Sequence, residues 1–84
     1  MDKQTILKAF YDAIIENESL TKSIYGSKPV PPQIDDTILA ISSMDFIDLI
    51  IEVETRLNTE FPEDCMTDYN IPIKDLVERI EACV

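Results

Sequence analysis

The sequence predicts an all-α protein, a small bundle of three main helices and one short helix. Apolar residues recur every three to four positions in several segments, and no segment shows the apolar–polar alternation of a half-buried strand. The chain has 84 residues, which is enough for one small core. We therefore expect residues 1–84 to form a single domain.

The first helix is expected over residues 3–18. Ile6, Phe10 and Ile14 recur every four residues and so share one face of a helix. Asp2 stands directly before this segment, where a short polar side chain caps a helix.

A long loop, residues 20–41, is expected between the first and second main helices. Its centre, residues 26–32, contains three prolines. Proline and the residue before it favour extended backbone over helix. Loops of this length in a small domain are usually functional or mobile, so we expect this one to move more than the helices.

The second helix is expected over residues 43–58, and Pro62 then interrupts the chain. Residues 63–69 are a candidate short third helix. The last helix is expected to start at Asn70-Ile71-Pro72, with Pro72 near the first helical position, where a proline loses no hydrogen bond.

At about 100° per residue, the second helix divides into three stripes. They are a core stripe (Phe46, Leu49, Ile50, Val53 and Leu57), an outer apolar stripe (Met44, Ile47 and Ile51) and an acidic stripe (Asp45, Asp48 and Glu52). Exposed apolar stripes usually mark interfaces. The alternative is that the short third helix covers the outer apolar stripe, which then belongs to the core.

The second helix begins with a capping box, Ser42-x-x-Asp45. In this motif Ser42 accepts an unpaired backbone N–H of the first turn while Asp45 reaches back to the cap. Ser43 then holds the first helical position, where the helix dipole and free amides favour a phosphate group. Two adjacent serines at the start of a helix more commonly serve only to cap it.

Negative charge is concentrated in the middle of the chain. Residues 35–68 contain ten Asp/Glu and one basic residue, Arg56, which amounts to −9 of the total net charge of −10. Such a surface attracts basic protein partners and repels the phosphates of nucleic acid. We expect protein partners and no nucleic-acid binding.

The composition argues against an enzyme. The chain has no histidine and one glycine, so it lacks a ready acid or base near neutral pH and a phosphate-binding loop. Cys65 and Cys83 match no metal pattern and are expected to be reduced thiols in a cytoplasmic protein. No metal site, catalytic residue or membrane span is expected, since the longest apolar run covers only residues 38–41.

The residues that lead into the second helix are Leu39-Ala40-Ile41-Ser42-Ser43-Met44-Asp45, and the acidic amphipathic segment continues without gaps to Asp64. This stretch resembles the acyl carrier protein family, whose signature is Asp-Ser-Leu preceded by Leu-Gly-x. The resemblance is specific over residues 38–64 and general elsewhere. Ser42 replaces the usual Asp and Ala40 the usual Gly, which indicates a divergent carrier dedicated to a particular pathway.

The resemblance implies that Ser43 bears a covalent 4′-phosphopantetheine arm, whose thiol carries acyl groups as thioesters. It implies partner contacts at Met44, Asp45, Ile47, Asp48, Ile51, Glu52 and Glu54. The chain would be a stand-alone, monomeric, non-catalytic carrier of fatty-acid, polyketide or related biosynthesis. A phosphopantetheinyl transferase would install the arm from coenzyme A, and acyl-loading and acyl-processing enzymes would dock through basic surfaces.

Two alternatives stay open at this point. One is a D-alanyl or other aminoacyl carrier, which would use the same arm. The other is an acidic interaction module without a prosthetic group, binding a partner helix through the outer apolar stripe. For a carrier we also expect an apolar gap beneath the second helix to shelter cargo, lined by Phe46, Leu49, Ile50 and Ile71.

Overall fold

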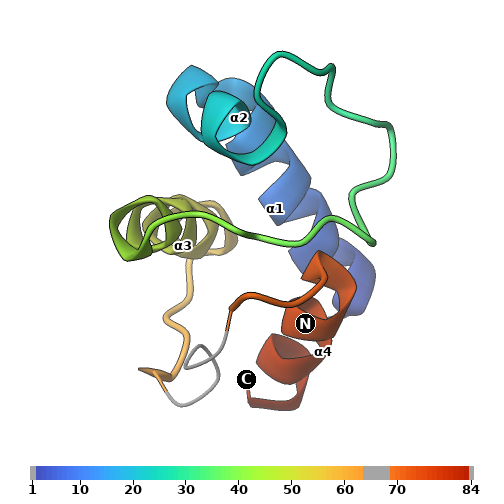
Figure 1. Cartoon of the computed structure of the whole chain (residues 1–84). Coiled ribbons are helices and arrows are strands. Elements are labelled where there is room, and N and C mark those ends of the chain that lie inside the picture. Colours follow the sequence, from blue (N-terminus) through green and yellow to red (C-terminus); the bar gives the residue numbers. More distant parts are fainter. Residues whose placement is uncertain (1, 64–68, 84) are drawn as a thin grey trace.

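Four α-helices make up the computed structural model, which describes residues 2–63 and 69–83 (Figure 1). They are α1 (Lys3–Glu16), α2 (Glu18–Tyr25), α3 (Ser43–Leu57) and α4 (Ile73–Cys83). Within the described residues there is no strand, only an isolated antiparallel bridge between Ile38 and Pro72. The predicted fold class, a small helical bundle, is confirmed.

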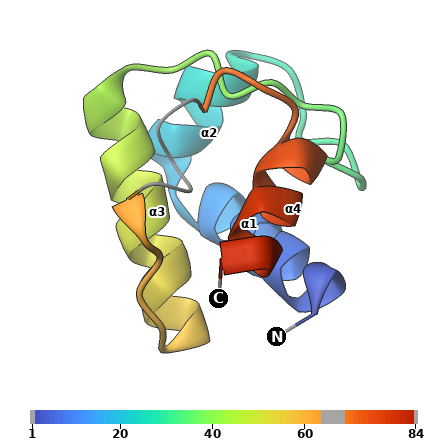
Figure 2. The same ribbon diagram turned by 90° about the horizontal axis from the view of Figure 1, so that it is seen from below.

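Helix α1 is the centre of the bundle, because it packs against each of the other three helices. Figures 1 and 2 show α3 crossing α1 obliquely, α4 beside the N-terminal half of α1, and α2 at its C-terminal end. The buried residues that the main helices contribute are Ile6, Ala9, Phe10, Ala13 and Ile14 from α1, Phe46, Leu49, Ile50 and Val53 from α3, and Ile73, Leu76, Val77 and Ile80 from α4. The helical periodicities read from the sequence therefore meet in one core.

The expected helix over residues 3–18 is in fact interrupted at Asn17. This residue has extended backbone (φ −117°, ψ 102°), so α1 ends before it and α2 begins after it. Its backbone N–H donates to the Ile14 carbonyl (3.3 Å), and its side-chain Oδ1 accepts the N–H of Leu20 (3.2 Å). Thr21 Oγ1 also donates to the Ile14 carbonyl, at 2.5 Å. Asn17 thus caps both helices at the corner.

The expected long loop over residues 20–41 is correspondingly shorter. Its first part belongs to α2, which Leu20 anchors in the core with 2% of its surface exposed. Gly26 ends α2 with a positive φ (64°), which glycine adopts without steric cost. The prediction of a long proline-rich loop therefore holds only for residues 27–41, between the end of α2 and the start of α3.

That remaining loop is fastened to the start of α4. Ile73 N–H donates to the Thr37 carbonyl (2.8 Å), and Lys74 N–H donates to the Asp35 carbonyl (3.0 Å). The loop also buries Ile34 and Leu39 completely or nearly so. It is better anchored than its proline content indicates, and its greater mobility stays a prediction.

Two expectations concern the region before α4 and the cysteines. The short helix expected over residues 63–69 falls largely on residues 64–68, which lie outside the described residues, as does Cys65. Cys83 is disulfide-bonded, so the expectation of a reduced thiol is wrong there. Sequence spacing does not reveal whether two cysteines approach within bonding distance, and that distance decides the matter.

Replacing Asn17 with alanine is expected to destabilise the protein by about 1 kcal/mol, because α2 loses its N-cap acceptor. For a domain of this size the melting temperature should fall by roughly 4–8 °C. Ser19→Ala, an exposed change in the same turn, is the matched control and should have little effect. Equal melting temperatures for Asn17→Ala and the wild type would show that the corner is not held by this cap.

Candidate functional site

The first turn of α3 carries the candidate attachment residue. Ser42 has extended backbone, and its Oγ accepts the N–H of Asp45 at 3.2 Å. Its carbonyl accepts the N–H of Phe46 at 3.0 Å. Ser43 is therefore the first residue of the helix, as predicted, and its side chain is exposed.

The other half of the predicted capping box is not formed. The Asp45 carboxylate does not reach back to Ser42; its Oδ2 instead accepts a hydrogen bond from Ser23 Oγ, at 3.1 Å. This contact exists because α2, absent from the sequence-based prediction, brings Ser23 beside the first turn of α3. The serine cap was predictable from its motif, whereas the Ser23 contact depends on tertiary packing.

The core and outer apolar stripes of α3 lie largely as predicted. Four members of the core stripe are buried, and the fifth, Leu57, is half-buried. In the outer apolar stripe the exposed fractions are 76% for Met44, 55% for Ile47 and 54% for Ile51. The alternative in which these three residues belong to the core is therefore wrong for this structure. An apolar stripe this exposed is typical of a contact surface.

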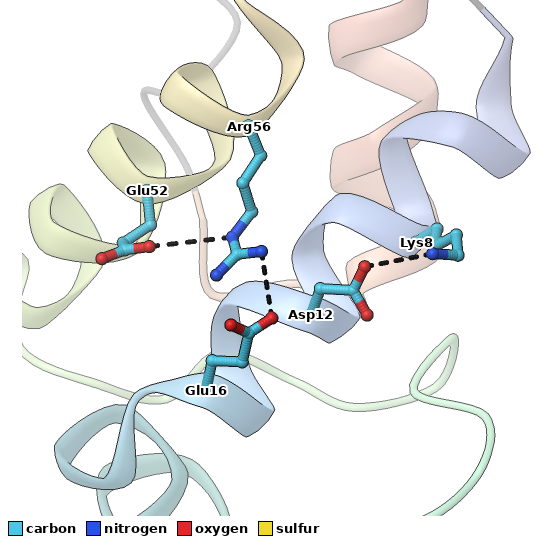
Figure 3. Close-up of polar contacts among 5 residues, drawn as sticks. All are labelled: Lys8, Asp12, Glu16, Glu52 and Arg56. Carbon is cyan, nitrogen blue, oxygen red and sulfur yellow. Dashed lines mark hydrogen bonds and ion pairs between the residues drawn. The ribbon is translucent and has the colours of Figure 1, made fainter.

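At the C-terminal end of the acidic stripe, Glu52 takes part in an ion-pair network that leaves Asp48 out. Arg56 Nη1 donates to Glu16 Oε2 of α1 at 3.1 Å, and Arg56 Nε lies 3.7 Å from Glu52 Oε2 (Figure 3). Figure 3 also shows the Lys8–Asp12 pair of α1, at 3.2 Å, close to this network. The hydrogen bond to Glu16 raises the pKa of Arg56, which remains a cation.

This network gives Glu52 and Asp48 different surroundings. Glu52 is half-buried and partly neutralised by Arg56. Asp48 is exposed and takes part in no ion pair with the described residues. Of these two predicted contact residues, Asp48 presents the freer charge to a partner.

Glu54 has a structural contact that sequence reasoning missed. Its Oε2 accepts the N–H of Phe61 at 2.7 Å, and its carbonyl accepts the N–H of Thr59 at 3.1 Å. Helix α3 ends at Leu57, and the next residue, Asn58, caps it in a left-handed backbone conformation (φ 52°). Glu54 thereby fastens the chain as it turns back, and this places Phe61 in the core with 6% of its surface exposed.

A pocket of about 560 Å³ lies beside α3, with Ser43 among its lining residues. The other lining residues are Phe46, Ile47, Ile50, Ile51 and Glu54 of α3, followed by Glu60, Phe61, Glu63 and Tyr69. Phe46 and Tyr69 stack, with ring centroids 4.1 Å apart and planes 11° from parallel. The Tyr69 hydroxyl donates to the Ile41 carbonyl at 3.3 Å.

The lining agrees in part with the expected gap beneath the second helix. Phe46 and Ile50 line the pocket as expected. Leu49 does not, because it is fully buried in the core, and Ile71 is packed half-buried elsewhere. Phe61 and Tyr69 were missed, since they reach the pocket from segments distant in sequence. Three of the seven predicted contact residues also line this pocket, namely Ile47, Ile51 and Glu54. The other four, Met44, Asp45, Asp48 and Glu52, do not.

Comparison with known proteins gives no match: no protein-family model, curated protein or solved structure is similar to the chain. Among the described residues, no helix is both long enough and apolar enough to cross a membrane. The function is therefore inferred from the site's own geometry and from the sequence resemblance over residues 38–64.

Charge reversal should separate the two acids of the stripe. Asp48→Lys is expected to change the free energy of unfolding by less than about 0.5 kcal/mol, because Asp48 is exposed and unpaired among the described residues. Glu52→Lys should cost about 1 kcal/mol at low salt, because it places a lysine against Arg56. Urea unfolding at low and high salt measures both, and equal losses would contradict the division of the stripe.

Proposed function

We propose that this chain is an acyl carrier that performs no catalysis and bears 4′-phosphopantetheine on Ser43. The observation that carries the proposal is the position of Ser43, which is exposed on the first turn of α3 and lines a largely apolar pocket. It lies within the stretch of sequence that resembles acyl carrier proteins. The arm would supply a terminal thiol on which acyl groups are held as thioesters.

The residues around Ser43 fit such a group. A phosphodiester at the first helical position is favoured by the dipole and the free amides of a 15-residue helix. The Ser42 side chain is occupied by the Asp45 N–H, while the Ser43 hydroxyl makes no hydrogen bond with the described residues. Phe46 and Ile50 offer apolar surface close by for the far end of a cargo.

Attachment needs a transferase, because no described side chain is hydrogen-bonded to Ser43 as a base. In the transferase reaction Ser43 Oγ attacks the phosphorus that bears pantetheine in coenzyme A. A new P–O bond forms, the diphosphate P–O bond breaks, and adenosine 3′,5′-bisphosphate leaves. The Ser43 proton passes to a base of the transferase.

Partner enzymes would dock on the face that adjoins Ser43. Met44, Ile47 and Ile51 offer exposed apolar contact, and Asp48 offers the free charge beside them. Acids of this kind steer basic partners and speed association more than they tighten it. Fast, weak docking suits a carrier, because tethered cargo is already presented at high effective concentration.

The exposed outer apolar stripe also supports a second candidate, an interaction module without a prosthetic group. Such a module would bind a partner through Met44, Ile47 and Ile51 and leave Ser43 unmodified. An aminoacyl carrier would be modified on Ser43 like an acyl carrier and differ in its cargo. Modification of Ser43 therefore separates carriers of either kind from the module.

Incubation with coenzyme A and a phosphopantetheinyl transferase should add the mass of one phosphopantetheine to the wild-type protein. Ser43→Ala should abolish the gain with nearly unchanged helicity, because Ser43 contributes no cap. Ser42→Ala, the matched control, should still be modified but lose about 1 kcal/mol of stability with its cap. Intact-mass spectrometry reads both results, and a modified Ser43→Ala protein would refute the assignment.

Asp48→Lys should slow modification by the transferase at low ionic strength by up to about tenfold, because it removes a steering charge. High salt should bring the two rates together by screening. Asp75→Lys on α4 makes the same change of net charge at an exposed position away from the stripes of α3 and should leave the rate nearly unchanged. Equal slowing by both variants would point to net charge and not to a docking face.

A further inference from the structure

The pocket beside α3 combines apolar walls with an acidic rim. Its charged lining residues in the described part of the chain are Glu54, Glu60 and Glu63, all of one sign. No described cation lines the pocket to balance these carboxylates.

Two of the three carboxylates are available to act on a bound group. Glu54 is already engaged by the Phe61 N–H. Glu60 and Glu63 are exposed and form no ion pair with the described residues. An acyl group that ends in a carboxylate would place a like charge beside them and lose hydration in an apolar space, both of which are unfavourable.

The stacked rings of Phe46 and Tyr69 line the same pocket, and Phe46 lies one helical turn from Ser43. The Tyr69 ring is held by its stack with Phe46 and by the hydroxyl bond to the Ile41 carbonyl. Past Phe46 the pocket continues along α3 over Ile50 and Ile51. An uncharged, apolar acyl group would contact these apolar side chains, which favours its burial in the pocket.

We propose, building on the proposed function, that this pocket selects uncharged, apolar acyl groups carried on Ser43 over acyl groups that end in a carboxylate. Glu60 and Glu63 disfavour the terminal carboxylate, while the apolar walls favour a hydrocarbon chain. The pocket thereby sets which loaded forms of the carrier are sheltered by the bundle.

The test compares melting temperatures of the full chain after a promiscuous transferase has loaded it from different acyl-coenzyme A thioesters. Intact mass first confirms loading, and the protein bearing the unacylated arm is the reference. Hexanoyl loading should raise the melting temperature by at least about 4 °C, a readily measured shift for this size of domain. Adipoyl, of equal carbon number but ending in a carboxylate, should give little or no rise.

A double variant assigns this effect to Glu60 and Glu63. Glu60→Gln with Glu63→Gln should bring the adipoyl shift up toward the hexanoyl shift. Glu18→Gln with Glu81→Gln makes the same charge change at exposed positions outside the pocket and should not.

The outcomes distinguish this inference from the function on which it rests. A wild-type protein that never gains the mass of the arm would overturn the proposed function. A modified protein with equal hexanoyl and adipoyl shifts, or with an adipoyl shift unmoved by Glu60→Gln and Glu63→Gln, would overturn the selection inference alone.

Discussion

Helix α3 packs against α1 through one stripe of apolar side chains, and the positions of the other residues of α3 follow from that contact. Phe10 and Ile14 of α1 are fully buried, as are Leu49 and Val53 of α3. Since residues on a helix are spaced by about 100°, turning the core stripe inward turns the outer apolar and acidic stripes outward. Arg56 adds a polar clamp between the same two helices through Glu16. Ser43 is exposed because of this orientation.

Both ends of α3 are then held by contacts that also shape the pocket. At the start, Ser42 caps the helix, and Ser23 binds Asp45 from α2. At the end, Glu54 accepts the Phe61 N–H and draws the returning chain alongside the helix. Together with Tyr69, stacked on Phe46, this return provides the wall that faces α3 across the pocket. The attachment residue and the apolar space beside it therefore result from one local arrangement.

Features with a local or periodic signal were predictable from the sequence. The start of α3, its three stripes and the Ser42 cap depend on spacing within one helix, and the structure confirms each of them. Helix α2 was missed because its eight residues bury only Leu20, and its start depends on the particular side-chain bonds at Asn17. The Arg56–Glu16 clamp and the Phe46–Tyr69 stack join residues far apart in the chain, which no periodicity reports.

The account depends on one covalent modification, and peptide-level mass spectrometry of the protein isolated from its own host tests it most directly. Trypsin cleaves after Arg56, so a single peptide ending there contains both Ser42 and Ser43. We expect this peptide to carry 4′-phosphopantetheine, with fragment ions that place the group on Ser43. A peptide found only in unmodified form, or one that carries the group on Ser42, would contradict the account.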